Sequence, residues 1–184
     1  MSFAGTVTLI GYRGTGKSTV APLLARSLGW KCVDSDVELE HRAGRTIADI
    51  FADDGEAVFR QLERQTIVDL LNNGNQVLSV GGGAILNADT RSDLRTAGPV
   101  IWLTATIDTI CDRIDSDTMT AQRRPNLTQH TDPCEEIGAM LAAREGLYAD
   151  AATHVVATDD RQPDQIHDAI LSEIRDLVQP GSTP

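Results

Sequence analysis

The sequence of 184 residues has little cysteine and no long apolar run. Its three cysteines, Cys32, Cys111 and Cys134, are far apart and odd in number, which argues against a disulfide scaffold and against a metal-binding spacing. No apolar stretch approaches the roughly 20 residues that a membrane-spanning helix needs. The first five residues lack the basic region and cleavage site of a signal peptide. These absences predict a protein of a reducing, cytoplasmic compartment, without a membrane span.

Positive charge is also scarce. The chain has 16 basic and 27 acidic residues, and its formal net charge is −11. Such a chain is repelled by nucleic acid and by anionic membranes, so we expect neither as a partner. Lys17 and Lys31 are the only lysines, and the remaining basic residues are arginines. A compositional bias would produce this excess, but arginine also suits two-pronged contacts with carboxylate and phosphate groups.

Short β-branched runs alternate with amphipathic segments along the chain. The predicted strands are Thr6–Ile10, Lys31–Asp34, Gln76–Val80, Pro99–Leu103 and His154–Ala157. The predicted helices are Lys17–Leu28, a longer helix from about Val58 to Leu71, Thr106–Ile114, Glu135–Tyr148 and Asp164–Val178. This alternation predicts a three-layer α/β fold, with a five-stranded parallel sheet and helices on both faces.

Domain organisation follows from the same pattern. Residues 5–178 are expected to form one domain, with residues 179–184 as a C-terminal tail. The polar segment from about 115 to 132 has no clear periodicity and is long for a passive connection, so it is predicted to be a lid. In a parallel sheet of this kind, ligands bind at the carboxyl ends of the strands.

Residues 11–18, GYRGTGKS, match the P-loop pattern G-x-x-x-x-G-K-[ST], with a predicted strand before them and a predicted helix after them. The glycines let backbone N–H groups converge on phosphate oxygens at a helix N-terminus. Lys17 can reach the β- and γ-phosphates, and the Ser18 hydroxyl can ligate Mg²⁺. The motif predicts nucleotide binding but does not identify the acceptor.

Two carboxylates, Asp34 and Asp36, follow the second predicted strand. In an extended segment residues i and i+2 point the same way, so both are expected to face the cleft beside the P-loop. One could hold Mg²⁺, and the other could accept a proton from an attacking hydroxyl. The alternative is that Asp34 or Ser35 caps the following helix.

Further groups suited to an anion lie near the predicted strand ends or in the predicted lid. Arg60 lies three residues before Glu63 on one helix face, and a glycine triplet, 81–83, follows the third strand. Two arginines precede Pro125 in the predicted lid, and Arg144 lies in the next helix. Each group also has a purely structural explanation: a surface ion pair for Arg60 and Glu63, a turn for the glycines, and a solvated or helix-end charge for the other arginines. Their shared location favours an anionic acceptor.

With these motifs in this order, the chain resembles the shikimate kinases, which are nucleoside-monophosphate-kinase-like P-loop enzymes. The matching segments are the P-loop, D-x-D at Asp34–Asp36, G-R-x-I-A-D-I-F at Gly44–Phe51, G-E-x-x-F-R-x-x-E at Gly55–Glu63, the triple glycine, R-P at Arg124-Pro125 and R-x-x-L-Y at Arg144–Tyr148. The resemblance implies strand order 2-3-1-4-5. It also implies ATP-dependent phosphorylation of the 3-hydroxyl of shikimate in chorismate and aromatic amino-acid biosynthesis, by a cytoplasmic monomer that uses Mg²⁺.

The resemblance also implies roles for individual residues. The implied catalytic residues are Lys17, Asp36 and Arg124, and the implied Mg²⁺ ligands are Ser18 and Asp34. ATP would be bound by Gly14, Thr15, Gly16, Lys17, Ser18, Thr19, Arg113, Arg124, Arg161 and Pro163. Shikimate would be bound by Asp36, Arg60, Gly81, Gly82, Gly83 and Arg144. Glu63 would orient Arg60. The segment between Arg113 and Arg124 is longer than the family's usual one, so Arg123 could take the role given to Arg124.

Two other functions are compatible with the motifs. A gluconate-type or other small-metabolite kinase would share the fold and also take a hydroxy acid. A nucleotide-binding module without turnover would keep the P-loop alone, and the intact Lys17, Asp34, Asp36 and Arg124 argue against it.

Overall fold

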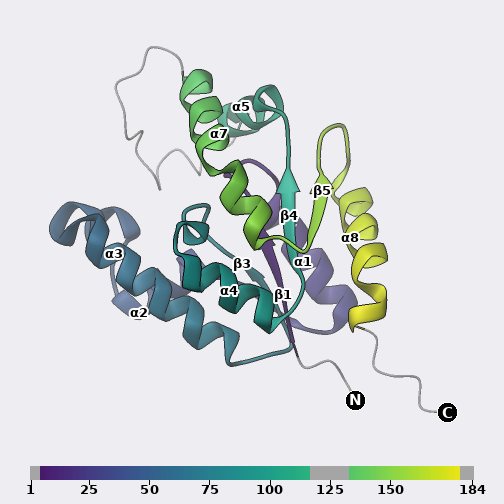
Figure 1. The fold of residues 1–184 in the computed structure, drawn as a ribbon, viewed down its shortest axis with the longest axis horizontal. Coiled ribbons are helices and arrows are strands. Elements are labelled where there is room, and N and C mark those ends of the chain that lie inside the picture. The colour runs from purple at the N-terminus through teal and green to yellow at the C-terminus, as the bar shows by residue number, and fades with distance from the viewer. Residues whose placement is uncertain (1–4, 117–132, 179–184) are drawn as a thin grey trace.

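The computed structural model of the protein describes residues 5–116 and 133–178, which form an α/β fold around one parallel sheet (Figure 1). Its strands are β1 (Thr6–Ile10), β2 (Lys31–Asp34), β3 (Gln76–Ser79), β4 (Val100–Thr104) and β5 (His154–Ala157). The five strands lie in the order β2-β3-β1-β4-β5, and every neighbouring pair is parallel. The predicted fold class and the strand order implied by the resemblance are confirmed.

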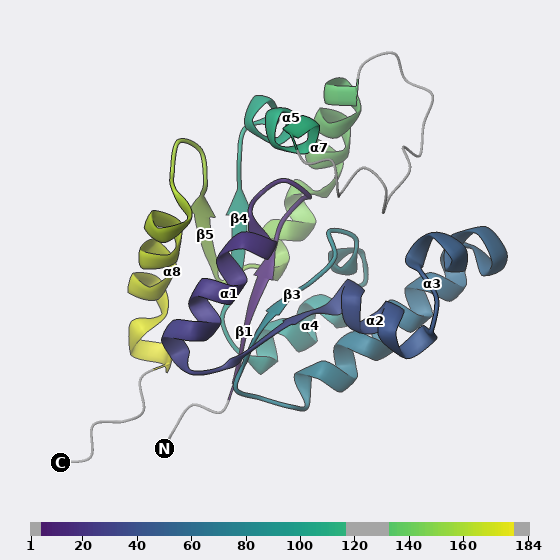
Figure 2. The same cartoon turned by 180° about the vertical axis from the view of Figure 1, so that it is seen from behind.

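Helices cover both faces of the sheet, as the two opposite views in Figures 1 and 2 show. They are α1 (Lys17–Leu28), α2 (Ser35–Ala43), α3 (Ile47–Leu71), the 3₁₀ turn η1 (Ala84–Leu86), α4 (Ala88–Ala97), α5 (Ile107–Ser116), α7 (Pro133–Ala151) and α8 (Pro163–Val178). None of the helices in the described ranges is long and apolar enough to cross a membrane.

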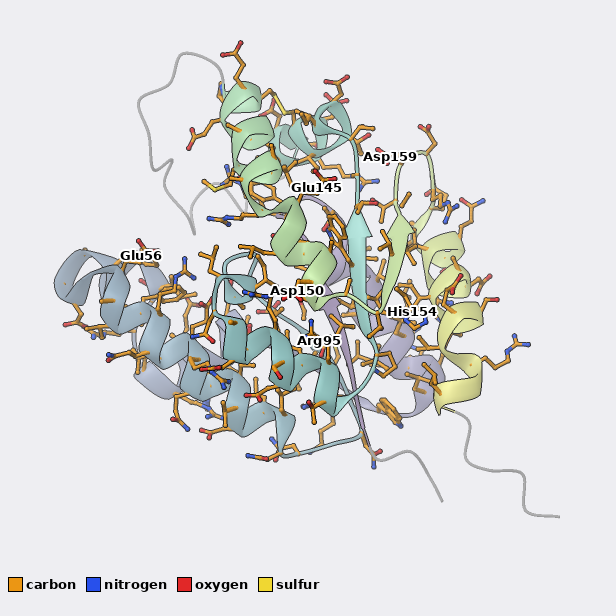
Figure 3. The ribbon with its side chains drawn as sticks, in the orientation of Figure 1. Glu56, Arg95, Glu145, Asp150, His154 and Asp159 are labelled. Atoms are coloured by element: carbon orange, nitrogen blue, oxygen red, sulfur yellow. A yellow bond between two sulfur atoms is a disulfide. The ribbon has the colours of Figure 1, made fainter. Side chains whose placement is uncertain are left out.

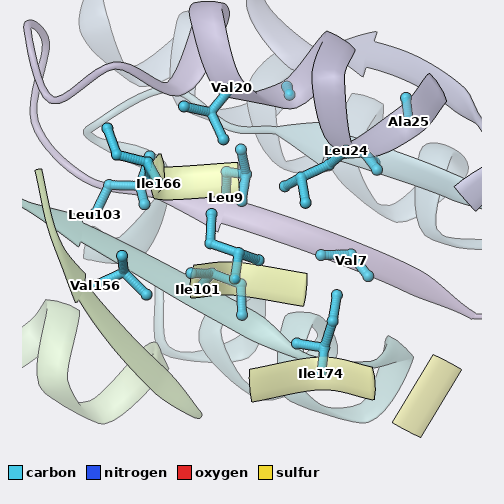
Figure 4. Close-up of a cluster of buried hydrophobic side chains, with 13 residues drawn as sticks. Val7, Leu9, Val20, Leu24, Ala25, Ile101, Leu103, Val156, Ile166 and Ile174 are labelled. Carbon is cyan, nitrogen blue, oxygen red and sulfur yellow. The ribbon is translucent and has the colours of Figure 1, made fainter. Parts of the chain in front are cut away.

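The core consists of one apolar layer on each face of the sheet. On one face, alternate residues of β1, Val7 and Leu9, pack with Leu24 of α1 and Ile166 of α8 (Figure 4). On the other face, Ile10 packs with residues of α3, α4 and α7. The strand ends are held firmly by these two layers, so the loops at their carboxyl ends can be positioned accurately.

Two helical features differ from the sequence-based prediction. Helix α4 was not predicted, because its sequence is polar and buries only Thr90 and Leu94. Helix α3 begins at Ile47, well before Val58, because Thr46 and Asp49 form a capping box at its start. A positive φ of 80° at Gly55 kinks α3 between its two parts.

The sequence argued against a disulfide scaffold, but the structure contains one disulfide. Cys111 on α5 and Cys134 on α7 form a disulfide, whereas Cys32 is free and exposed. The two bonded cysteines are 23 positions apart in the sequence, and the packing of α5 on α7 brings them together. Because disulfides are rare in reducing compartments, the cysteines do not support a reducing location.

Candidate active site

Six of the residues predicted from the sequence meet in one cavity of about 230 Å³ at the carboxyl edge of the sheet. They come from the P-loop, the β2–α2 junction and the glycines after β3: Lys17, Ser18, Asp34, Asp36, Gly81 and Gly82. The sequence analysis had not assigned the other lining residues, which are Arg13, Val37, Glu40, Ile47, Ser79 and Val80.

The P-loop is shaped by close backbone approaches and by its lysine. Gly11 has a φ of 143°, and a Cβ there would lie 2.5 Å from the carbonyl oxygen of Leu103, so only glycine fits. The Lys17 ammonium donates to the carbonyl oxygens of Gly11 at 2.7 Å and Tyr12 at 3.0 Å. Lys17 therefore holds the turn of the loop as well as bringing positive charge to the cavity.

The remaining P-loop residues lead into the open end of α1. Thr15 is buried, and its hydroxyl donates to the Tyr12 carbonyl at 2.8 Å. Gly16 is the N-cap of α1, with a φ of 93° and no side-chain capping bond. The first turn of α1 contains no acidic residue, and Thr19 lies within it. The N–H groups of this turn are therefore suited to an anion.

The expected extended geometry of Asp34 and Asp36 is wrong. Strand β2 ends at Asp34 and α2 begins at Ser35, so Asp36 lies in the first turn of a helix. Oδ1 of Asp34 caps this helix by accepting from the N–H groups of Asp36 at 3.0 Å and Val37 at 3.2 Å. Oδ2 takes no hydrogen bond from the described residues. The capping alternative is therefore correct, and both carboxylates still line the cavity.

The triple glycine is packed tightly between three side chains. A Cβ would lie 2.6 Å from Oδ1 of Asp36 at Gly81, and 2.5 Å from Nη1 of Arg60 at Gly83. At Gly82 it would lie 3.3 Å from the hydroxyl of Tyr148. These approaches explain the glycines without any need for positive φ angles, and they bring side chains of α2, α3 and α7 to one loop.

Arg60 on α3 is held by two carboxylates. Its Nη1 donates to Oε2 of Glu63 at 2.8 Å, and its Nη2 donates to Oε1 of Glu56 at 3.1 Å (Glu56 is labelled in Figure 3). Burial alone disfavours the charged guanidinium, but the bonds to Glu63 and Glu56 hold the pKa of Arg60 above its ordinary value. Arg60 therefore presents a fixed positive charge beside Gly83, and the predicted contact with Glu63 is present.

Helix α7 brings Arg144 and Tyr148 to the same loop. Nη1 of Arg144 lies 3.4 Å from the carbonyl oxygen of Gly82, and the Tyr148 hydroxyl donates to that oxygen at 2.9 Å. The predicted acceptor residues from α2, α3, α7 and the glycine loop are thus brought together. The sequence analysis gave Tyr148 no role.

Arg113 lies beside the P-loop and joins it to the end of β5. Its Nη1 donates to the carbonyl oxygen of Gly14 at 3.2 Å and to the hydroxyl of Thr158 at 2.9 Å. Arg161 is exposed, and Pro163 is the first residue of α8. The start of the predicted lid, at about residue 115, belongs instead to α5, which runs to Ser116. Arg123 and Arg124, with the rest of the predicted lid, lie outside the described residues.

Two charged side chains of the cavity were missed by sequence reasoning. Arg13 stands at a variable position of the P-loop, and its Nε is buried without a hydrogen-bond partner among the residues the structure describes. Oε1 of Glu40 accepts from the N–H of Ile47 at 3.0 Å, and so holds the start of α3 against α2. Arg13 could have been singled out as a basic residue inside the motif, whereas Glu40 gives no local signal.

Curated relatives of the chain share one activity name. A family model described as shikimate kinase matches residues 13–175. A shikimate kinase of Symbiobacterium thermophilum is 39% identical over 175 residues, which cover 95% of this chain and 99% of that protein. A shikimate kinase of Oleidesulfovibrio alaskensis is 42% identical over 150 residues, which cover 82% and 86% of the two chains.

Solved structures agree with the sequence relatives. Shikimate kinase from Acinetobacter baumannii in complex with shikimate matches with a TM-score of 0.84 and 31% identity, over 95% of this chain and 96% of that chain. A gluconokinase from Sinorhizobium meliloti matches with a TM-score of 0.59 and 19% identity, over 97% and 95% of the two chains, which shows the fold alone. The chain therefore belongs to the shikimate kinase family.

Proposed function

We propose that the chain transfers the γ-phosphoryl group of ATP to the 3-hydroxyl of shikimate, giving ADP and shikimate 3-phosphate for aromatic amino-acid biosynthesis. The observation that carries the proposal is the meeting of the P-loop, Asp36 and the paired Arg60 around the glycine loop. A phosphate cradle and a carboxylate-binding arginine then lie on either side of a candidate base. Membership of the family makes the chain an ATP-dependent phosphotransferase with an alcohol acceptor.

The nucleotide half of the site would act through positioning and charge. The P-loop amides, with Gly14, Thr15, Gly16, Ser18 and Thr19, would surround the phosphates at the N-terminus of α1. Lys17 would exchange its bonds to loop carbonyls for bonds to phosphate oxygens. Arg113, Arg161 and Pro163 would flank the adenine, which agrees with the position of Arg113 beside the P-loop.

The donors beside the P-loop fit Mg²⁺. This ion keeps several waters and usually needs one or two protein carboxylates besides substrate phosphates. Ser18 and Asp34 line one cavity, and Oδ2 of Asp34 is not used in capping α2. The bound ion would neutralise charge on the phosphate oxygens.

The acceptor half would bind the shikimate carboxylate through Arg60 and Arg144, because a guanidinium grips a carboxylate with two parallel hydrogen bonds. Gly81, Gly82 and Gly83 would allow the ring to approach the backbone closely. Asp36 would anchor ring hydroxyls and accept the proton from the attacking 3-hydroxyl. The proposed charge-neutralising role of Arg124 rests on the sequence alone and stays a prediction.

We also propose that the enzyme acts as a cytoplasmic monomer without nucleic-acid or membrane partners. The net charge of −11 disfavours nucleic acid and anionic membranes as partners. The need for ATP supports the compartment, while the Cys111–Cys134 disulfide counts against it.

The test measures ADP release and product formation with shikimate and with gluconate, for the wild type and for Asp36→Asn. We expect turnover with shikimate alone, and at least about a hundredfold loss of kcat in Asp36→Asn with ATP affinity retained. Turnover with gluconate but not with shikimate would overturn the proposed acceptor. Substantial turnover in Asp36→Asn would remove Asp36 from the role of base.

A further inference from the structure

The carbonyl oxygen of Gly82 receives two side-chain donors from one helix. The Tyr148 hydroxyl donates to it at 2.9 Å, and Nη1 of Arg144 lies at 3.4 Å. The first distance is that of a good hydrogen bond, whereas the second is at the long end of the range. Arg144 and Tyr148 are four residues apart, so they occupy the same face of α7 one turn apart.

Three of the other backbone groups of the glycine loop form hydrogen bonds inside the protein. The N–H of Gly81 donates to Oγ of Ser35, and the carbonyl oxygens of Gly81 and Gly83 accept from the N–H groups of Ala84 and Leu86. The N–H groups of Gly82 and Gly83 have no acceptor within residues 5–116 and 133–178. The loop is therefore fixed by its internal bonds, with two N–H groups available to a ligand.

Tyr148 is held in place more firmly than its neighbour Arg144. Its side chain is fully buried, and its ring stacks on Trp102 of β4 with centroids 5.4 Å apart. Arg144 is only half-buried, and its side chain is longer and has more rotamers than that of Tyr148. When a carboxylate binds, Arg144 can turn to it, but the Tyr148 hydroxyl cannot leave the Gly82 carbonyl without losing its packing.

We propose that Tyr148 is a positioning residue that satisfies the Gly82 carbonyl and thereby releases Arg144 to the acceptor carboxylate. Without the hydroxyl, Arg144 would be the remaining side-chain donor at this carbonyl, and the acceptor would have to compete for it. Leaving a half-buried carbonyl without a donor is unfavourable, so that competition weakens acceptor binding. The inference rests on the proposed role of Arg144 in acceptor binding.

Tyr148→Phe tests this role, because it removes the hydroxyl and keeps the ring that stacks on Trp102. We expect the KM for shikimate to rise about three- to tenfold, the usual worth of one net hydrogen bond, with the KM for ATP unchanged. Thr153→Val is the matched control. The Thr153 hydroxyl donates to the carbonyl of Val100 at 3.1 Å, at the amino ends of β4 and β5 and thus away from the cavity. Its loss should lower Tm and leave both KM values unchanged.

A double-mutant cycle separates the alternatives. In an Arg144→Ala background, Tyr148→Phe should no longer change the KM for shikimate, because the competing donor is absent. If Tyr148→Phe lowers only Tm, or still raises this KM without Arg144, the inference is overturned. If Arg144→Ala itself leaves the KM for shikimate unchanged, the proposed acceptor role of Arg144 fails, and the inference fails with it.

Discussion

The guanidinium of Arg60 lies 2.8 Å from the carboxylate of Glu63, whose side chain is only 5% exposed, while the other partner, Glu56, is 64% exposed. The two carboxylates therefore hold the same arginine from different environments. The interaction with the buried carboxylate is screened only weakly by water and salt. The interaction with the exposed carboxylate is screened strongly, and such a surface ion pair stabilises a protein by about 0–1 kcal/mol. The orientation of Arg60 beside Gly83 thus depends chiefly on Glu63.

Glu63→Gln should raise the KM for shikimate roughly tenfold and leave the KM for ATP unchanged, because Arg60 loses the charged partner that orients it. Glu56→Gln is the matched control, since it removes the exposed partner of the same guanidinium, and it should change the KM for shikimate less than twofold. Steady-state kinetics with each substrate varied in turn checks both variants. Equal effects of the two substitutions would show that burial of Glu63 does not matter.

Asp34 has two separable tasks, and two substitutions divide them. Asn is as good an N-cap as Asp, so Asp34→Asn should keep Tm close to that of the wild type while lowering kcat and raising the Mg²⁺ concentration needed for half-maximal activity. Asp34→Ala removes the cap as well, and should destabilise the fold by about 1 kcal/mol. The measurements are thermal unfolding and a Mg²⁺ titration of turnover. Unchanged Mg²⁺ dependence in Asp34→Asn would exclude Asp34 from the metal site.

The sequence predicted those parts of the fold that local patterns determine. The strands at Thr6–Ile10 and Lys31–Asp34 and the helix at Lys17–Leu28 agree with the structure, because apolar runs and a glycine-rich turn mark their ends. The extended geometry at Asp36 was wrong, since a side-chain cap at Asp34 starts α2 at Ser35, whereas the strand argument kept the chain extended through Asp36. An aspartate after a strand can accept hydrogen bonds from the next backbone N–H groups and so start a helix, and the local sequence does not distinguish this from a longer strand.

Contacts between distant segments were beyond sequence reasoning. The Cys111–Cys134 bond depends on how α5 packs on α7, and the Tyr148 bond to Gly82 depends on how α7 lies over the end of β3. Neither has a signature in spacing, because both are set by tertiary packing. The residues of the candidate site that belong to a sequence motif were predicted. The role of Tyr148 was missed, because it bonds to Gly82, which is 66 residues away in the sequence.

The disulfide should stabilise the protein measurably. Closing a loop between positions 23 apart restricts the unfolded chain, and the chain-entropy relation gives roughly 3 kcal/mol. Cys134→Ser, or reduction of the wild type, should lower the free energy of unfolding in urea by about this amount. Cys32→Ser, which removes the free exposed cysteine, is the control and should have little effect. Three titratable thiols in the folded, unreduced protein would contradict the bond.

The last prediction uses two glycines whose surroundings differ. A Cβ at Gly83 would lie 2.5 Å from Nη1 and 2.8 Å from Nη2 of Arg60, whereas a Cβ at Gly146 on α7 would meet nothing within 4 Å. The clash at Gly83 is with the end of a flexible side chain, so the fold can survive while Arg60 is displaced. Gly83→Ala should therefore raise the KM for shikimate at least tenfold, with little change in Tm.

Gly146→Ala is its control. In a helix interior this change should stabilise the protein by up to about 1 kcal/mol, because alanine loses less backbone entropy than glycine. It should leave both KM values unaltered, although α7 also carries Arg144 and Tyr148. If Gly83→Ala instead lowers Tm strongly and leaves the KM for shikimate unchanged, the displacement of Arg60 does not affect acceptor binding. The carboxylate would then have to be bound elsewhere in the cavity.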